Sequence, residues 1–191
     1  MTPFYPVSLN LIGRKCVVIG ARDDREAIDK EAALREAGAD VLWIDDVTAV
    51  QDADLRDAFF VISTPQDESL SRRLRALADE HRFLLCCIDQ PAYGFVAMAA
   101  IAKAGPVRIA ISTTGLAPRV GKVLKEALQH AMDATFERFI DCLATQKTRV
   151  KRKYSDPADS PIRRKAMIEA ATGFTAEIAF SYPEWFDDAE R

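Results

Sequence analysis

The first half of the chain alternates short apolar runs with longer amphipathic stretches, and this alternation constrains the fold more than any other feature. Helical spacing of apolar residues is clearest over Arg25–Glu36 and Ser69–His81. Runs of strand length precede, separate and follow these two segments: Lys15–Ile19, Asp40–Ile44, Ala58–Ser63, Phe83–Ile88 and Val107–Ser112. Strands that alternate with helices indicate βαβ units. The sequence therefore predicts an α/β fold, with a Rossmann-like, mostly parallel sheet flanked by helices.

A different architecture follows the last of these runs. Pro118 suits the first position of a helix, and from there to its end the chain has the pattern of a wholly helical segment. A turn-rich stretch over residues 155–161 divides two of the helices. Near the C-terminus lie four aromatic residues: Phe180, Tyr182, Trp185 and Phe186. Their side chains indicate a tail that covers apolar surface.

The composition excludes several classes of protein. With 191 residues, of which 49% are apolar and 29% charged, the chain can bury a core, so it is neither disordered nor a small disulfide-dependent domain. No apolar run approaches the roughly 20 residues that cross a bilayer, and the N-terminus lacks the pattern of a signal peptide. We therefore expect a cytoplasmic protein with no membrane partner. Four cysteines and two histidines show no spacing typical of a zinc site, so no metal ligands are predicted.

Charge is divided unevenly along the chain. Residues 1–105 carry 12 basic and 17 acidic side chains, whereas residues 106–191 carry 14 and 12. Basic residues gather between Lys147 and Lys165, where Tyr154 is the lone aromatic residue. The net charge of −3 and the scarcity of aromatics in this stretch disfavour nucleic acid as a partner. The basic residues fit either a ligand with many carboxylates or a solvated helix face.

The end of the first predicted strand is where a dinucleotide-binding fold places its glycine-rich phosphate loop. Here Gly20 is followed by Ala21, Arg22 and then acidic residues, so the glycine fingerprint is absent. The negative charges of Asp23 and Asp24 disfavour a phosphate at the start of the next helix. Residues of this loop either contact a cofactor or cap the helix.

Two aspartates each follow a predicted strand. Asp45 comes 25 residues after Gly20, near the offset of the acid that binds the ribose of a nicotinamide cofactor. Asp89 follows Phe83–Ile88 at the edge where open α/β sheets bind their ligands, and it could accept a proton from a substrate. Either aspartate could instead only organise its own turn.

A second candidate site lies at the start of the long helix. The backbone amides of residues 115–117 and the hydroxyls of Thr113 and Thr114 lie at the positive end of the helix dipole, which favours an acidic ligand. Arg119 and Lys122 follow. These cations would surround a ligand rich in carboxylates or form a solvated face.

Four segments share a family pattern in the same order along the chain: Tyr5–Lys15 (YPVSLNLIGRK), Phe60–Leu70 (FVISTPQDESL), Cys87–Pro91 (CIDQP) and Gly105–Pro118 (GPVRIAISTTGLAP). Together they resemble the N-terminal siroheme synthase family, which comprises precorrin-2 dehydrogenases, some of them also sirohydrochlorin ferrochelatases. Each motif alone is weak, but four in order span most of the chain.

The resemblance implies a homodimer that oxidises precorrin-2 to sirohydrochlorin with NAD as hydride acceptor. Where a family member also inserts metal into sirohydrochlorin, Fe2+ is the second substrate. It implies a Rossmann-like NAD-binding-type domain over residues 1–105, a dimerisation region with a long helix over 106–145, and a helical C-terminal domain over 146–191. Asp89 matches the acid that the family links to catalysis, and the tetrapyrrole is a polyanion that suits the basic second half.

The resemblance also implies two sets of binding residues. The cofactor-binding set is Gly20, Ala21, Arg22, Asp45, Ser63 and Thr64, and the tetrapyrrole-binding set is Ser112, Thr113, Thr114, Gly115, Arg119 and Lys122. The chain departs from the family by keeping Gly20 alone of a triple-glycine loop, by having Ala117 in place of a serine, and by being very roughly twenty residues shorter between Asp46 and Leu55. A non-redox tetrapyrrole-binding protein or chelatase that has lost NAD binding is therefore the alternative function.

Overall fold

The structure, a computed structural model, describes residues 4–189. The chain divides into two compact units, one formed by residues up to 102 together with 109–126, the other by residues 103–108 together with those from 127 onward. The division into three regions at residues 105 and 145 stays a prediction.

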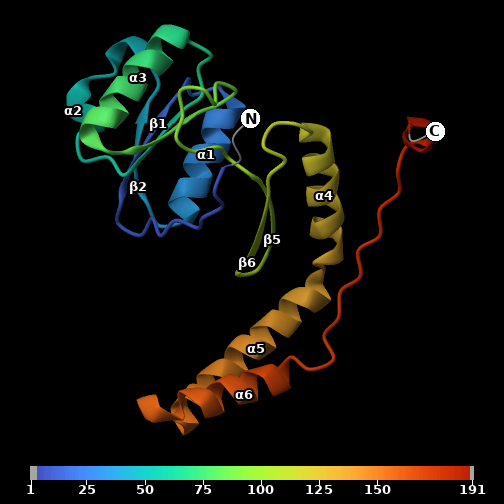
Figure 1. Cartoon of the computed structure of the whole chain (residues 1–191). Helices are drawn as coiled ribbons and strands as arrows, with labels where there is room; N and C mark the ends of the chain where they lie inside the picture. The colour runs from blue at the N-terminus through green and yellow to red at the C-terminus, as the bar shows by residue number, and fades with distance from the viewer. Residues whose placement is uncertain (1–3, 190–191) are drawn as a thin grey trace. The chain divides into compact units, whose positions relative to one another are not determined.

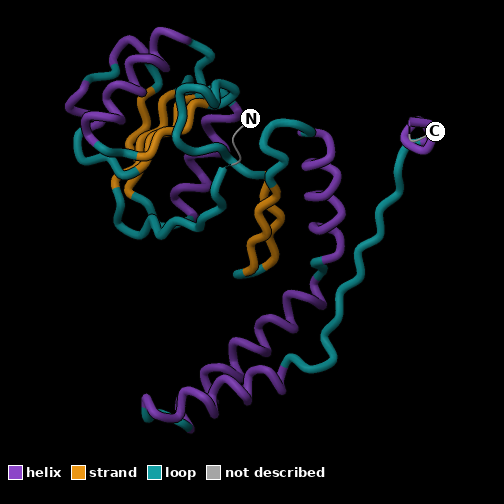
Figure 2. The backbone as a smooth tube through the Cα atoms, viewed as in Figure 1, coloured by secondary structure: helices purple, strands orange, loops and turns teal. Residues whose placement is uncertain are grey.

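The core of the first unit is a four-stranded sheet whose strands pair in parallel. In chain order the strands are β1 (Lys15–Ile19), β2 (Asp40–Ile44), β3 (Phe60–Ser63) and β4 (Leu84–Cys87). Their spatial order is β2-β1-β3-β4. The strands lie together with helices around them (Figures 1 and 2). The chain thus winds outward from β1 in one direction and from β3 in the other, so the topological switch point lies between these two strands. The predicted α/β fold is confirmed.

Two helices cover opposite faces of this sheet. Successive residues of a strand point to opposite faces, and β1 contributes Val17 and Ile19 to one apolar cluster and Cys16 and Val18 to the other. The first cluster holds apolar residues of α3 (Glu68–His81), and the second holds residues of α1 (Arg25–Glu36). Burial on both faces explains why the strands read as nearly continuous apolar runs.

The connection from β2 to β3 contains two short elements that the sequence pattern did not reveal. They are η1 (Val47–Ala49) and α2 (Asp52–Leu55). Leu55 is fully buried in the cluster under α3. The Arg73 guanidinium of α3 donates to the Val50 carbonyl at 3.1 Å and pairs with Asp52 at 2.6 Å, which fastens this connection to the helix.

The predicted strand over residues 107–112 is present, but it lies outside the main sheet. This segment is β6 (Val107–Ile111), which pairs with β5 (Ala100–Ala104) in a separate two-stranded sheet. A turn at Gly105, whose φ is +50°, joins the two strands into a hairpin. The sequence did not reveal β5 because alanine and lysine, which form most of its sequence AIAKA, have low strand propensity.

The rest of the chain is mostly helical. Its elements are α4 (Pro118–Ala131), α5 (Ala134–Lys153), η2 (Pro157–Asp159), α6 (Ser160–Ala170) and α7 (Glu184–Ala189). Helix α5 begins at the side chain of Asp133, which accepts the amide protons of Thr135 and Phe136 at 2.8 and 2.9 Å. Helices α5 and α6 pack together, and the ring of Phe174 stacks on Phe139 at 5.2 Å between centroids.

The expectation of an entirely helical second half is wrong between α6 and α7. Residues 174–183 form an irregular segment. Within it Phe180 and Tyr182 are 61% and 65% exposed, and the Tyr182 ring stacks on Phe186 at 5.2 Å between centroids. That this tail covers apolar surface stays a prediction. No helix in the described part of the chain has an apolar stretch long enough to cross a membrane.

Candidate functional site at the carboxyl edge of the sheet

The parallel sheet brings five of the predicted site residues to one edge. Because all four strands run in the same direction, Asp45, Gly20, Thr64 and Asp89 follow their carboxyl ends in the spatial order of β2, β1, β3 and β4. Ser63 is the last residue of β3 and pairs in register with Cys87 of β4. This edge is where open α/β sheets bind ligands, with the crevice at the switch point between β1 and β3.

Gly20 is needed where the end of β1 approaches the end of β3. A Cβ atom on Gly20 would lie 2.3 Å from the Thr64 hydroxyl oxygen and 3.0 Å from the Ala27 Cβ. The Gly20 amide donates to the Ile44 carbonyl at 3.0 Å, which ties it to β2 as well. The absence of a side chain at Gly20 is therefore required by internal packing.

Asp24 occupies the start of α1. Its carboxylate accepts the amide proton of Glu26 at 2.9 Å, and the Thr64 hydroxyl donates to its other oxygen. The Thr64 hydrogen bond and the backbone amides hold the pKa of Asp24 below its ordinary value, against a smaller opposing effect of burial. A carboxylate thus sits at the helix end whose dipole would attract an anionic ligand.

Arg22 forms an ion pair with Asp45, the predicted ribose-binding acid. Its Nε lies 3.2 Å from Asp45 Oδ2, and its guanidinium stacks 4.4 Å above the ring of Trp43. The Trp43 indole N–H donates to the Gly20 carbonyl at 2.8 Å, so the stack is anchored at the end of β1. Arg22 and Asp45 are 60% and 54% exposed, which leaves the pair open to solvent. Ala21, the remaining predicted cofactor residue, is exposed in the same loop.

Asp89 follows β4, the outermost strand at this edge, and its backbone has an unusual conformation. Its φ is +57°, a left-handed conformation that aspartate and asparagine adopt more readily than most residues. Its side chain is exposed, and the Gln66 side-chain amide donates to Oδ2 at 3.2 Å. The turn that contains Asp89 and Gln90 is anchored to α3, because the buried Ser71 hydroxyl of this helix donates to the Gln90 side-chain carbonyl. The carboxylate is therefore fixed in place and open to solvent.

Sequence reasoning assigned no role to Gln66, Ser71 or Gln90. A polar residue soon after a strand, the signal used for Asp89, also marks Gln66, which lies three residues beyond β3. Ser63, predicted to bind the cofactor, is instead fully buried, and its hydroxyl has no hydrogen-bond partner within the described structure.

The predicted tetrapyrrole-binding turn is stabilised by hydrogen bonds between its own residues. The Thr114 amide donates to the Ser112 hydroxyl at 3.2 Å, and the Leu116 amide donates to the Thr113 carbonyl at 2.9 Å. Thr114 and Gly115 both have positive φ angles, 51° and 78°.

Helix α4 begins after this turn and presents two of the predicted cations. Arg119 and Lys122 are exposed on its first turns, and Lys122 pairs with Glu126 at 3.9 Å. Among described residues, the hydrogen bonds of the turn before the helix are internal, so they do not join this predicted site to Asp89.

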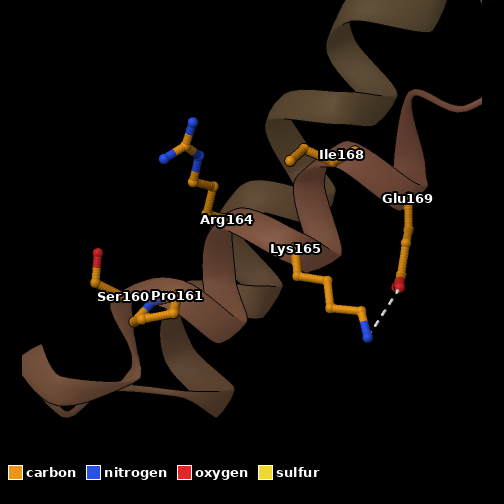
Figure 3. A pocket seen from close by; sticks show the side chains of 6 residues that line it. All are labelled: Ser160, Pro161, Arg164, Lys165, Ile168 and Glu169. Atoms are coloured by element: carbon orange, nitrogen blue, oxygen red, sulfur yellow. Dashed lines mark ion pairs between the residues drawn. The ribbon is translucent and has the colours of Figure 1, made fainter.

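A hollow of about 500 Å³ on α6 is unrelated to this edge (Figure 3). Its lining residues are Ser160, Pro161, Arg164, Lys165, Ile168 and Glu169. Arg164 points away from Lys165, which turns toward Glu169 at 3.9 Å (Figure 3). Because these cations do not converge, the hollow is not a built anion site. Among the described residues, no group of three or more histidine, cysteine, aspartate or glutamate side chains could hold a metal ion.

The residues of the cofactor half do not fit a nicotinamide dinucleotide in its usual position. In this fold the pyrophosphate rests on the amides that begin the first helix, and the acid after the second strand binds the ribose. Here Asp24 accepts a hydrogen bond from one of those amides, and Asp45 is paired with Arg22. The start of α1 thus already holds a carboxylate, and the predicted ribose-binding acid already has a cationic partner.

Comparison with known proteins shows which chains this one is similar to. Residues 7–100 match a family described as putative NAD(P)-binding. The siroheme synthases of Nitrosospira multiformis and Thioalkalivibrio sulfidiphilus are each 26% identical to this chain, over 93% and 98% of its length. The predicted resemblance to the N-terminal siroheme synthase family is thereby confirmed.

Other similarities agree with this resemblance. The siroheme synthase of Nitrosococcus oceani is 26% identical over 78% of the chain. A solved structure of SirC, a precorrin-2 dehydrogenase, has the same fold, with a TM-score of 0.71 at 19% identity, and the match covers 89% of this chain and 90% of that one. The chain spans about two fifths of the length of the siroheme synthases it matches, between 36% and 41%. The matched NAD(P)-binding segment includes Asp89 and ends before Ser112.

Proposed function

We propose that the chain acts on a tetrapyrrole of the siroheme branch, precorrin-2 or sirohydrochlorin, and that Asp89 accepts a proton from it. The observation that carries this proposal is the exposed Asp89 carboxylate at the ligand-binding edge of the sheet. The Gln66 side chain donates a hydrogen bond to it, and the Asp89 backbone has a left-handed conformation in a turn that Ser71 anchors. A carboxylate held in place at such an edge is suited to general base work. The siroheme synthase relatives supply the class of substrate.

One carboxylate can serve two reactions of such a substrate. Oxidation of precorrin-2 to sirohydrochlorin releases a proton together with a hydride, and metal insertion requires the pyrrole nitrogens to lose their protons. In either case Asp89 would take the proton directly and pass it to solvent, to which its side chain is open.

The first candidate activity is that of an oxidoreductase, a precorrin-2 dehydrogenase with NAD as hydride acceptor and, in an additional ferrochelatase step, Fe2+ as substrate. The family match and the names of the relatives support it. The tetrapyrrole carboxylates would meet the residue 112–115 turn and the exposed cations Arg119 and Lys122. A homodimer in the cytoplasm is part of the same proposal.

The second candidate is a tetrapyrrole-binding protein or chelatase that works without a nicotinamide cofactor. The position of Asp24 at the start of α1 specifically favours it, because a fixed negative charge there opposes the pyrophosphate. This candidate keeps Asp89 as the proton acceptor and uses no hydride acceptor.

Two measurements under anaerobic conditions test the proposal. Titration with sirohydrochlorin should show saturable binding, and incubation with precorrin-2, with and without NAD, separates the two candidates by whether sirohydrochlorin forms. Asp89→Asn should retain binding and lose at least about 100-fold in turnover, a loss typical of a missing general base. Asparagine tolerates the same positive φ, so the variant should fold.

The matched control is Asp29→Asn, which removes the same charge from an exposed position on α1. Full turnover by Asp89→Asn, or equal losses in the two variants, would show that Asp89 is not the proton acceptor. Absence of any tetrapyrrole binding by the folded wild-type chain would refute the proposed substrate class.

A further inference from the structure

We propose that Asp24 is a built-in anion that takes the place of a dinucleotide pyrophosphate at the switch point of the sheet, and that it keeps nicotinamide dinucleotides out. This inference deepens the second candidate function and rests on the proposed function only for its tetrapyrrole control. It assigns to Asp24 a role in ligand selection beyond that of a helix cap.

The first argument is position. The switch-point crevice lies between the ends of β1 and β3, and Gly20 and Thr64 follow these two strand ends. The Asp24 carboxylate is hydrogen-bonded to Thr64 on the β3 side and to the Glu26 amide on the helix side. It therefore bridges the two structures between which a dinucleotide would place its phosphates.

The second argument is space. A methyl group on Gly20 would lie 2.3 Å from the Thr64 hydroxyl and 3.5 Å from Asp24 Oδ2. The Thr64 and Asp24 side chains thus both lie next to Gly20, at the strand end that a phosphate would approach. A dinucleotide could enter only if Asp24 left both of its hydrogen-bond donors.

The third argument is charge. The Thr64 hydroxyl and the helix amides stabilise the ionised form of Asp24, so the side chain is an anion at neutral pH. Glu26, the second residue of the helix, pairs with Lys30 at 2.6 Å, and Arg22 contacts Asp45 and Trp43. Two of the nearby cations that could offset repulsion of a pyrophosphate are thereby held by other partners.

The fourth argument concerns the other end of the cofactor. The acid that would bind the adenine ribose, Asp45, accepts a hydrogen bond from Arg22, whose guanidinium carbon lies 4.4 Å from the centroid of the Trp43 ring. An incoming ribose would have to separate this pair. The pyrophosphate and ribose positions are therefore occupied by separate, independent contacts of the chain with itself.

The test is a calorimetric titration of the full chain with NAD and with NADH. Asp24→Asn is the decisive variant, because asparagine caps a helix about as well as aspartate and removes the charge at nearly the same size. Its carbonyl oxygen can still accept the Glu26 amide proton, while its NH2 group takes the place of the oxygen that accepts from Thr64. Asp23→Asn is the matched control, since it removes the same charge from the neighbouring exposed position. We expect weak or undetectable binding by the wild-type chain, binding at least about tenfold tighter by Asp24→Asn, and less than about a threefold change for Asp23→Asn.

Tight binding of NAD by the wild-type chain, or equal affinities in the wild type and Asp24→Asn, would overturn the inference. Sirohydrochlorin titration of the same three proteins separates this failure from failure of the proposed function, because tetrapyrrole binding should be unchanged by either substitution. Circular dichroism spectra and melting temperatures of the variants establish that they are folded before the affinities are compared.

Discussion

Replacement of Gly20 by alanine tests the packing on which the arrangement of the strand ends depends. The backbone of Gly20 lies outside the left-handed region, so alanine is allowed there and only space is at issue. The new Cβ would meet the Thr64 hydroxyl oxygen at 2.3 Å and the Ala27 Cβ at 3.0 Å. Since Thr64 is buried and bonded to Asp24, it cannot swing aside without breaking that hydrogen bond.

The magnitude follows from two contributions. Overpacking of a tight site costs about 1–3 kcal/mol, and loss of a hydrogen bond to a partly exposed charged group adds about 1 kcal/mol. We therefore expect Gly20→Ala to lower the free energy of unfolding by about 2–4 kcal/mol. Urea denaturation followed by tryptophan fluorescence measures it, in a Trp185→Phe background so that Trp43 alone reports on the first unit.

Gly121→Ala is the control for this substitution. Its Cβ would meet the Thr113 methyl group at 3.6 Å, an ordinary contact, and alanine in place of a helix-interior glycine stabilises by about 0.5–1 kcal/mol. In the double variant Gly20→Ala/Thr64→Ala the clash with the Thr64 hydroxyl disappears and the 3.0 Å contact with Ala27 remains, so the two substitutions together should cost at least about 1 kcal/mol less than their sum. A Gly20→Ala chain as stable as the wild type, or strict additivity in the double variant, would refute the reasoning.

Two further predictions concern titration and thiol chemistry. Because hydrogen bonds lower the pKa of Asp24 in the folded chain, its contribution to stability is complete above the ordinary aspartate pKa of 3.8 and is lost as the pH falls through the lowered value. In Thr64→Val, carbon-13 NMR should find the Asp24 carboxyl titrating at higher pH than in the wild type, and an identical midpoint in both chains would contradict the assigned cause. At pH 8, iodoacetamide should label the exposed Cys142 first, because burial raises the pKa of Cys86 to about 11 and encloses all three other cysteines. Mass spectrometry of the native chain checks this, and rapid labelling at a second cysteine would contradict it.

The strands of the main sheet could be predicted from the sequence because each strand is marked by the residues of its own short segment. Strands buried on both faces are continuous apolar runs, and β1 to β4 fall within one or two residues of the predicted ranges. The hairpin was not predictable in the same way. β5 lacks β-branched residues apart from Ile101, and the pairing of β6 with β5 instead of β4 depends on tertiary packing that periodicity does not report.

The candidate site shows the same distinction. That Asp24 could cap α1 and that Asp89 would lie at a strand end were both readable from the sequence, because each depends on nearby residues. The hydrogen bond from Thr64 to Asp24 joins residues 40 positions apart, and that from Gln66 to Asp89 joins residues 23 positions apart. Such partners appear only when the strands are placed side by side, so the occupation of the crevice could not be predicted.

The segment after β4 also determines whether another strand can pair with the outer edge of the sheet. The amides of Phe95 and Val96 both donate to the carbonyl of Leu85, at 2.8 and 3.0 Å, and a side chain on Gly94 would meet that same oxygen at 3.1 Å. This segment therefore caps the outer edge of β4, and a foreign strand cannot add there without displacing it. Edge-to-edge association through the sheet is thereby restricted to β2, where the short strand opens with a charged residue, Asp40, that discourages such pairing.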